Sequence, residues 1–237
     1  MKIYFWMPAC VALGVVVFRW QDILPALTQV LPTPTISTIA PTIAPVNLPS
    51  TGDGDLIPNL IERASGSVFL VQTSSGLGSG FAVKLANGRV VGLTNAHVVK
   101  DDITVALNTF TGIPLQATVI GKDREADVAV LELSAALPPL PTTSAVRQGE
   151  VIIALGNPLG IQGVATVGHV SKVAHEADGR TLMIGDVDIA PGNSGGCSLN
   201  TKGEVVAINA GVNKTAAYIS YLIPIASAMK IAEAIAK

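Results

Sequence analysis

The chain has 237 residues, of which 49% are hydrophobic and 14% charged, and its 15 basic and 17 acidic side chains give a net charge of −2 at pH 7. This charged fraction is well below the roughly 25% of typical soluble domains, which excludes a disordered chain. Basic residues are not in excess, so nucleic acid is not an expected partner. The 23 glycines and 15 prolines favour short strands joined by turns over a helical bundle.

The amino terminus contains a charge-free apolar run over residues 3–18, between Lys2 and Arg19. Its length falls between the roughly 7–15 apolar residues of a cleavable signal and the roughly 17–25 of a membrane-spanning helix. A buried core helix is the alternative interpretation. Because a polar linker follows, we expect residues 1–22 to be a membrane anchor or signal segment. The rest of the chain would then lie outside the cytoplasm, and it would be secreted if the leader is cleaved.

Residues 23–52 carry no charged side chain and are rich in proline and threonine. Such a composition cannot build a core and predicts an extended tether. The globular domain is therefore expected over residues 53–237. Cys10 lies in the predicted anchor and Cys197 in the domain, so they are not expected to pair. Two cysteines are too few for a disulfide framework or a cysteine zinc site, and we predict neither a metal nor a cofactor.

The domain shows two groups of short apolar runs separated by turn residues. A short helix is predicted over 55–64 and an amphipathic helix over 225–237. The first six strands are predicted at 67–73, 80–85, 90–94, 103–107, 117–122 and 128–133, before a proline-rich connector at 137–141. The second six are predicted at 151–156, 163–172, 181–184, 197–199, 204–209 and 218–224. This pattern predicts an all-β fold of two six-stranded β-barrels, at about 66–137 and about 145–224.

The sequence Ala-Pro-Gly-Asn-Ser-Gly-Gly at 190–196 places Ser194 among glycines. Serine is a weak nucleophile unless a base removes its proton. The glycines allow a tight turn and a close approach of substrate, so the N–H groups of Gly192 and Ser194 can form an oxyanion hole. An ordinary glycine-rich turn is the alternative, since glycine and asparagine are common in turns.

Two further residues favour the catalytic interpretation. His97 ends an apolar strand, and histidine is the commonest general base. Asp127 opens another apolar strand, where a carboxylate needs a partner, and an imidazole is a suitable one. The order His97, Asp127, Ser194 is that of the chymotrypsin arrangement, in which the cleft between the two barrels is the active site.

Five ordered motifs resemble the HtrA (Deg) group of trypsin-like serine proteases. They are GSGF at 78–81, TNAHVV at 94–99, ADVAVL at 126–131, ALGNPLG at 154–160 and PGNSGG at 191–196. The resemblance implies a chymotrypsin/trypsin-like endopeptidase with His97 as general base, Asp127 as its orienting acid and Ser194 as nucleophile. It also places Gly192, Asn193 and Ser194 in the oxyanion-hole loop. Relatives usually carry PDZ domains after the protease, and none is expected in a chain that stops at Lys237.

Specificity is less well defined by the sequence. Asp188 precedes Ser194 by six residues, a spacing that in trypsin-like enzymes marks the base of the S1 pocket, where a carboxylate attracts Lys or Arg. The alternative is that Asp188 turns away into a loop hydrogen bond or ion pair, because HtrA-like pockets accept small apolar side chains. Asn209, Ala210 and Gly211 are expected to form the opposite wall of the pocket.

The apolar N-terminal run and the resemblance together favour a membrane-tethered, extracytoplasmic endopeptidase. The resemblance alone implies that it degrades or processes unfolded proteins, with a homotrimer as the assembly common among relatives. Two other functions stay open. One is a non-catalytic holdase that uses the same cleft, and the other is a narrow processing protease that prefers a basic residue at P1. His169 is expected to be structural and His175 a solvated loop residue.

Overall fold

The computed structural model describes residues 55–112, 114–177, 179–213, 216 and 218–237. The predicted anchor at 1–22, the predicted tether at 23–52 and the first two residues of the predicted domain therefore lie outside the described residues. Within the described part, none of the helices combines the length and the apolar character that a membrane crossing requires.

The first barrel closes in the strand order β1-β2-β3-β6-β5-β4. Its strands are β1 Val68–Thr73, β2 Gly76–Lys84, β3 Val90–Thr94, β4 Thr104–Thr109, β5 Pro114–Asp123 and β6 Val128–Leu133. All neighbouring strands are antiparallel. Phe69, Leu107 and Leu131 are completely buried and fill the interior. Burial alternates along β4, whereas β1 and β6 each begin with four consecutive buried residues and are therefore covered on both faces.

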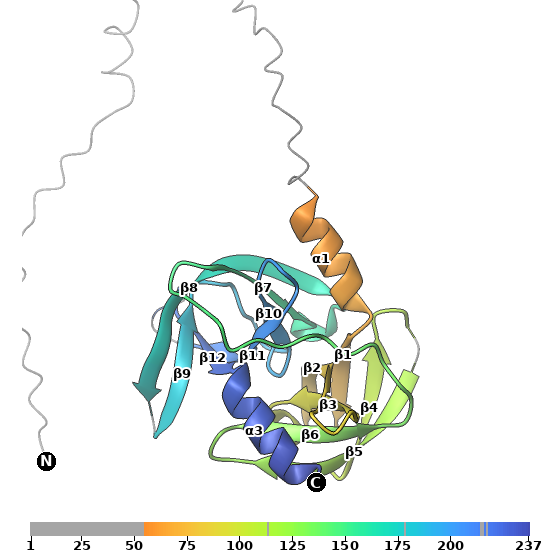
Figure 1. Cartoon of the computed structure of the whole chain (residues 1–237). Coiled ribbons are helices and arrows are strands. Elements are labelled where there is room, and N and C mark those ends of the chain that lie inside the picture. Colours follow the sequence, from red (N-terminus) through yellow and green to blue (C-terminus); the bar gives the residue numbers. More distant parts are fainter. Residues whose placement is uncertain (1–54, 113, 178, 214–215, 217) are drawn as a thin grey trace, which may run out of the picture. The chain divides into compact units, whose positions relative to one another are not determined.

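The second barrel has the strand order β10-β11-β12-β9-β8-β7 and is also closed. Its strands are β7 Val151–Gly156, β8 Val164–Ala177, β9 Arg180–Gly185, β10 Cys197–Leu199, β11 Val205–Val212 and β12 Ser220–Pro224. Ile152, Met183 and Leu222 belong to its core. Figure 1 shows this barrel beside the first, with the β8–β9 hairpin reaching outward.

Two helices flank the strands, α1 over Leu56–Ser65 and α3 over Ile225–Ile235. Helix α3 contacts β5 and β6 of the first barrel and β11 and β12 of the second, so it bridges the two barrels (Figure 1). A shared apolar cluster joins Phe81 and Leu93 of the first barrel to Ile153 and Ile208 of the second. The predicted all-β fold of two six-stranded barrels with terminal helices is confirmed.

Several element boundaries differ from those predicted. Strand β2 begins at Gly76 rather than at residue 80, because its first residues are exposed and give no apolar signal. Strand β8 continues to Ala177 rather than 172, since its polar end is held by pairing with β9 rather than by burial. Two short helices were not predicted, α2 at Ala96–Val99 and the 3₁₀ turn η3 at Pro158–Gly160.

Candidate active site

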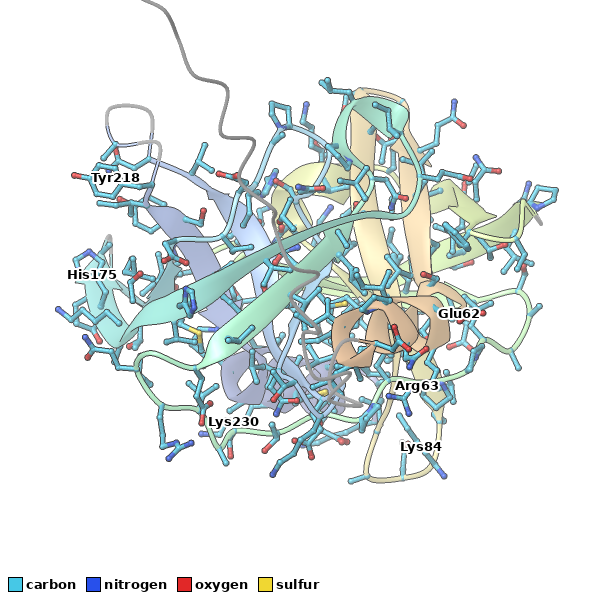
Figure 2. The ribbon with its side chains drawn as sticks, turned by 90° about the horizontal axis from the view of Figure 1, so that it is seen from above. Glu62, Arg63, Lys84, His175, Tyr218 and Lys230 are labelled. Atoms are coloured by element: carbon cyan, nitrogen blue, oxygen red, sulfur yellow. The ribbon has the colours of Figure 1, made fainter. Side chains whose placement is uncertain are left out.

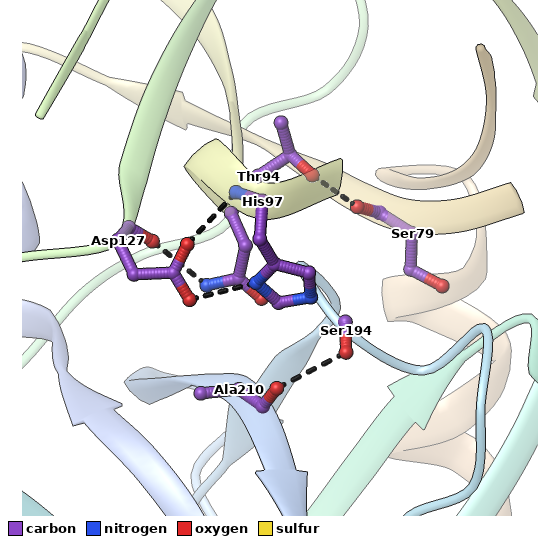
Figure 3. A network of polar contacts seen from close by, with 7 residues as sticks. Ser79, Thr94, His97, Asp127, Ser194 and Ala210 are labelled. Carbon is purple, nitrogen blue, oxygen red and sulfur yellow. Dashed lines mark hydrogen bonds and ion pairs between the residues drawn. The ribbon is translucent and has the colours of Figure 1, made fainter. Parts of the chain in front are cut away.

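His97 and Asp127 lie side by side at one end of the first barrel (Figure 3). The pairing of β3 with β6 brings helix α2, which follows β3, next to the residue that precedes β6. The His97 main-chain N–H donates to Asp127 Oδ1 at 2.9 Å, and His97 Nδ1 lies 2.8 Å from Asp127 Oδ2. One carboxylate thus contacts both the backbone and the ring of the same histidine, which sets the orientation of the ring.

Asp127 is itself held firmly. It is 8% exposed, and its φ of 60° lies in the left-handed region, which costs energy for a residue other than glycine. Asn95 donates from Nδ2 to the Asp127 carbonyl at 2.9 Å, which stabilises this conformation. The His97 side chain by contrast is half exposed, so the ring is open to a ligand.

Ser194 comes from the loop that precedes β10 in the second barrel. In Figure 3 the edge of the His97 ring that faces away from Asp127 points toward Ser194. The Ser194 hydroxyl donates to the Ala210 carbonyl on β11, at 3.1 Å. Among the described residues, Ala210 is the hydrogen-bond partner of the Ser194 hydroxyl, and no hydrogen bond joins this hydroxyl to the His97 ring. The three predicted residues are therefore brought together, with the hydroxyl turned toward β11.

The main chain around Ser194 forms a tight turn. Gly192 has a φ of 101°, and the Asn193 N–H donates to the Ala190 carbonyl at 2.9 Å. Asn193 N–H is thus occupied, although the prediction grouped it with the oxyanion-hole residues. The N–H groups of Gly192 and Ser194 have no acceptor among the described residues, so both can donate to a ligand oxygen.

Ser79 on β2 connects the first barrel to this turn. It is fully buried, its N–H donates to the Ser194 carbonyl at 2.8 Å, and its hydroxyl donates to the Gly192 carbonyl at 2.7 Å. The same hydroxyl accepts from the main-chain and side-chain nitrogens of Asn157, at 2.8 and 3.1 Å. Thr94 donates to the Ser79 carbonyl at 2.7 Å, as Figure 3 shows. The N–H and hydroxyl of Ser79 therefore join the two barrels, while its carbonyl is bonded within the first barrel.

Ser79 and Asn157 lie inside the GSGF and ALGNPLG motifs, but no role was predicted for either residue. A serine between Gly78 and Gly80, within an apolar strand, was the signal that could have identified it. A buried hydroxyl must find partners, and glycines on both sides leave room for another chain segment to supply them.

Gly192 and Gly195 must be glycines because other chain segments lie too close to leave room for a Cβ. Gly195 has a φ of 86°, and a Cβ there would collide with the Ser79 carbonyl and the Thr94 hydroxyl. At Gly192, a Cβ would lie 2.6 Å from the Asn157 carbonyl. A larger residue at Gly195 would push the Ser194 turn away from the first barrel, and one at Gly192 would push it away from the 157–159 segment that follows β7.

The residues predicted to bind substrate lie in different environments. Asp188 is exposed between buried Val187 and Ile189, and its carbonyl accepts from the Thr166 hydroxyl at 2.7 Å. This is a loop hydrogen bond of the main chain, and no contact of the Asp188 carboxylate with the other site residues is found in the described part.

Asn209 is fully buried, so its side chain does not line an open pocket. Its Oδ1 accepts from the Ser198 hydroxyl at 2.7 Å, and its Nδ2 donates to the Leu155 carbonyl at 3.2 Å. Its main-chain carbonyl accepts from the Gly195 N–H at 2.8 Å, which fixes the turn on β11. Ala210 and Gly211 are half-buried and follow on the same strand.

The other titratable groups lie outside this arrangement. His169 and Asp186 form an exposed pair, with Nδ1 and Oδ2 3.4 Å apart. Figure 2 shows His175 at the margin of the second barrel, on the same side as Tyr218. Burial raises the pKa of the Cys197 thiol to about 12, which keeps it neutral at pH 7. Within the described ranges, no group of three or more His, Cys, Asp or Glu side chains could hold a metal.

Comparisons with known proteins agree with this geometry. Residues 78–208 match the model of the trypsin-like peptidase domain. The chain is 39% identical over 168 residues to the putative serine protease HhoB of Synechocystis, a match that covers 67% of this chain and 40% of that protein. It is 33% identical over 175 residues to the serine protease Do-like HtrA of Bacillus subtilis, with 65% and 39% covered.

The chain therefore spans about two fifths of the length of the curated relatives that it matches. Among solved structures, the serine endoprotease from Yersinia pestis superposes with a TM-score of 0.66 at 31% identity, over 75% of this chain and 65% of that one. The match of fold, sequence and residue order shows that the chain belongs to the trypsin-like peptidase domain family and is similar to its HtrA members.

Proposed function

We propose that this protein is a serine endopeptidase in which Ser194 is the nucleophile, His97 the general base and Asp127 the residue that orients the base. The observation that carries the proposal is the double contact of one buried carboxylate with the backbone and the ring of His97. With a proton on Nδ1 held by Asp127, the other ring nitrogen is an acceptor on the side that faces Ser194.

In the proposed reaction, Ser194 Oγ exchanges the Ala210 carbonyl for His97 as its hydrogen-bond partner when substrate binds. Catalytic hydrogen bonds that are loose in a free enzyme often tighten in this way. Oγ then attacks the substrate carbonyl while His97 takes its proton. The oxyanion accepts from the Gly192 and Ser194 N–H groups, and His97 gives the proton to the departing amine. Water releases the acyl group by the reverse sequence.

An extended peptide is the substrate form that the site favours. Strand β11 pairs with β12 as far as Val212 but with β10 only through Ile208. In the described part, the β10-facing side beyond Asn209 has no strand partner, so a peptide can add there as a strand. The small residues Ala210 and Gly211 would then leave space for the side chain next to the scissile bond.

The cellular setting is inferred from the chain's organisation. Residues 53–237 form the proposed protease domain, and residues 1–22 its proposed anchor or leader, which would hold the domain outside the cytoplasm. A similar protein from Halomonas elongata, 37% identical over 173 residues, is described as a probable periplasmic serine endoprotease. We extend the same location to this protein, with unfolded proteins as substrates and a homotrimer as the assembly.

The test compares the purified full chain in mild detergent with its Ser194→Ala variant. Both are incubated with a fluorophosphonate probe and with unfolded casein. Ser171→Ala removes an exposed serine on β8 and serves as the control. The proposal requires labelling and cleavage in the wild type and in Ser171→Ala, and neither in Ser194→Ala. A folded wild type that binds casein without labelling or cleavage would instead support the holdase.

A further inference from the structure

The turn that carries Asp127 contains no glycine. Strands β5 and β6 stay paired as far as Asp123, so residues 124–127 connect them. Asp127 ends this turn with a φ of 60°, in the left-handed region. In the β2–β3 and β10–β11 turns a glycine takes such a position, Gly88 at 88° and Gly203 at 81°. Here the strained residue is the proposed orienting acid itself, so other contacts must hold the turn in place.

Packing holds this turn weakly. Ala126 lies against the shared apolar cluster, but Arg124 and Glu125 are exposed. On the side of the second barrel is a cavity of about 230 Å³, lined by Glu125 and Ala126 on the turn and by Thr181 on β9. Arg124 forms an ion pair with Asp101, but both side chains are largely exposed, and such pairs contribute little. Hydrogen bonds must therefore fix most of the turn.

Asp123 supplies such a hydrogen bond from inside the turn. Its Oδ1 accepts from the Ala126 N–H at 2.9 Å, which fixes the backbone one residue before Asp127. On the other side, Asn95 Nδ2 donates to the Asp127 carbonyl at 2.9 Å. The backbone of Asp127 is thus held from both sides. A strained backbone conformation persists only where its surroundings determine it in this way.

We propose that Asp123 is a positioning residue, whose side-chain oxygen keeps the turn in the conformation that presents the Asp127 carboxylate to His97. The inference rests on the proposed function. If the backbone of Asp127 relaxed toward negative φ, its Cβ would turn, and the carboxylate could no longer contact both the N–H and the ring of His97. The role requires an acceptor atom on residue 123 but no charge, so an amide should serve there as well as a carboxylate.

The experiment uses the full-length protein with Asp123→Asn, Asp123→Ser and Asp123→Ala. Asparagine keeps the acceptor, serine has a shorter and weaker one, and alanine has none. Asn87→Ala is the matched control. Asn87 Oδ1 also accepts from a main-chain N–H within a turn of the first barrel, that of Arg89 at 3.0 Å, but this turn carries no residue of the proposed active site.

Steady-state cleavage of an internally quenched peptide gives kcat and KM separately. We expect kcat to stay within about threefold of the wild type in Asp123→Asn and Asn87→Ala, and to fall roughly 10- to 10²-fold in Asp123→Ala, with Asp123→Ser between. KM should change little, because the lost contact acts on the reacting groups and not on substrate binding. The midpoint of thermal unfolding should drop similarly in Asp123→Ala and Asn87→Ala.

A second readout reports the contact with His97 directly. A ring N–H held by a carboxylate gives a proton magnetic resonance signal at unusually low field, and the signal that His97→Gln removes is that of the His97 ring. We expect this signal in the wild type, Asp123→Asn and Asn87→Ala, and its loss or broadening in Asp123→Ala. A residue that only stabilised the fold would leave the signal unchanged.

Three results would overturn the proposal. The first is a wild-type kcat in Asp123→Ala. The second is an equal loss in Asp123→Asn and Asp123→Ala, because the charge would then be the cause. The third is a lower kcat in Asp123→Ala with the low-field signal intact, since the effect would then not pass through Asp127.

Two further outcomes keep the test decisive. If Asp123→Ala does not fold, Asp123→Ser takes its place: a kcat equal to that of Asp123→Asn contradicts the proposal, and a lower one with a weaker signal supports it. If the wild type neither reacts with the fluorophosphonate probe nor cleaves, the proposed function fails. The low-field signal of the variants then still shows whether Asp123 holds Asp127 against His97.

Discussion

In the first barrel, the Asp127 carboxylate accepts from the His97 main-chain N–H at 2.9 Å and lies 2.8 Å from the His97 ring, whereas in the second barrel Ser194 is held mainly by its main chain. The Ser194 turn is fixed by Ser79 from the other barrel and by Asn209 from β11. The proposed acid–base pair thus depends on one barrel, while the proposed nucleophile and the candidate oxyanion hole depend on the interface. Substitutions in the two regions should therefore fail in different ways.

The largest effect is expected at the carboxylate. Asp127→Asn supplies one acceptor where the His97 backbone N–H and ring now use two, so the ring loses its fixed tautomer. We expect kcat to fall by about 10⁴-fold with the fold retained, as in triad enzymes generally. Steady-state peptide cleavage and circular dichroism measure the two effects. Asp186→Asn, which breaks the exposed pair with His169, should cleave like the wild type. Equal losses in both variants would contradict the assignment.

The next largest effect is expected from a substitution that disturbs the interface between the barrels. Gly195→Ala places a methyl group against Ser79 and Thr94 and should displace the Ser194 turn. We expect a loss of at least roughly 10²-fold in kcat/KM from misplacement, and a loss of about 1–3 kcal/mol in the free energy of unfolding.

Gly88→Ala is the matched control for this substitution. Gly88 has a φ of 88°, close to that of Gly195, but a Cβ there meets nothing within 4 Å. It should lose stability through backbone strain alone and keep its activity. Urea unfolding and probe labelling of both variants distinguish strain from displacement. A fully active Gly195→Ala would show that the close approach is unimportant.

A smaller effect is expected at Ser79, which contacts the loop and not the substrate. Ser79→Ala removes the donor to Gly192 and the acceptor for Asn157, so the 192–193 peptide loses its fixed orientation. We expect kcat to fall roughly 10- to 10²-fold with little change in KM, and an unfolding free energy lower by about 1–3 kcal/mol. A peptide aldehyde, which places an oxyanion in the hole, should lose affinity by a similar factor.

Ser65→Ala is the comparison for Ser79→Ala. Ser65 is also buried and donates to one carbonyl, that of Ile61, at 2.6 Å in α1. It should affect stability and leave both kcat and aldehyde affinity unchanged. If both variants changed only stability, Ser79 would have a structural role and no influence on catalysis.

The smallest effect concerns pH and the first barrel alone. The Ser74 N–H and hydroxyl donate to Asp102 and lower the pKa of its carboxyl from 3.8. A depressed folded pKa contributes stability above the unfolded value, and this stability is lost as pH falls through the folded value. Asp102→Asn should therefore be slightly less stable at pH 7 and show a flatter decline below about pH 4. Urea midpoints at pH 7 and pH 3 test this, and an unchanged pH slope would contradict it.

Much of this protein could be predicted from its chain. The two sets of six apolar runs correctly predicted two barrels, because each strand is a short apolar run bounded by turn residues. His97 and Asp127 could be selected because they follow and open apolar runs, where a polar side chain needs a partner, and Ser194 because it stands among glycines. The missed elements, α2 and the turn at Pro158–Gly160, are too short to carry any periodicity.

Other features arise only when distant segments meet. Ser79 and Asn157 are 78 residues apart in the sequence. The residues next to Ser79 in the chain do not show that its hydroxyl accepts from Asn157 and donates to the Gly192 carbonyl. Asn209 was predicted to face a pocket, but its side-chain amide is buried and hydrogen-bonds to Ser198 and Leu155 on neighbouring strands of the second barrel. Strand order in a closed barrel decides such contacts. Local composition is therefore sufficient for the barrels and the reactive residue types, whereas the direction of each polar side chain depends on packing between elements far apart in the chain.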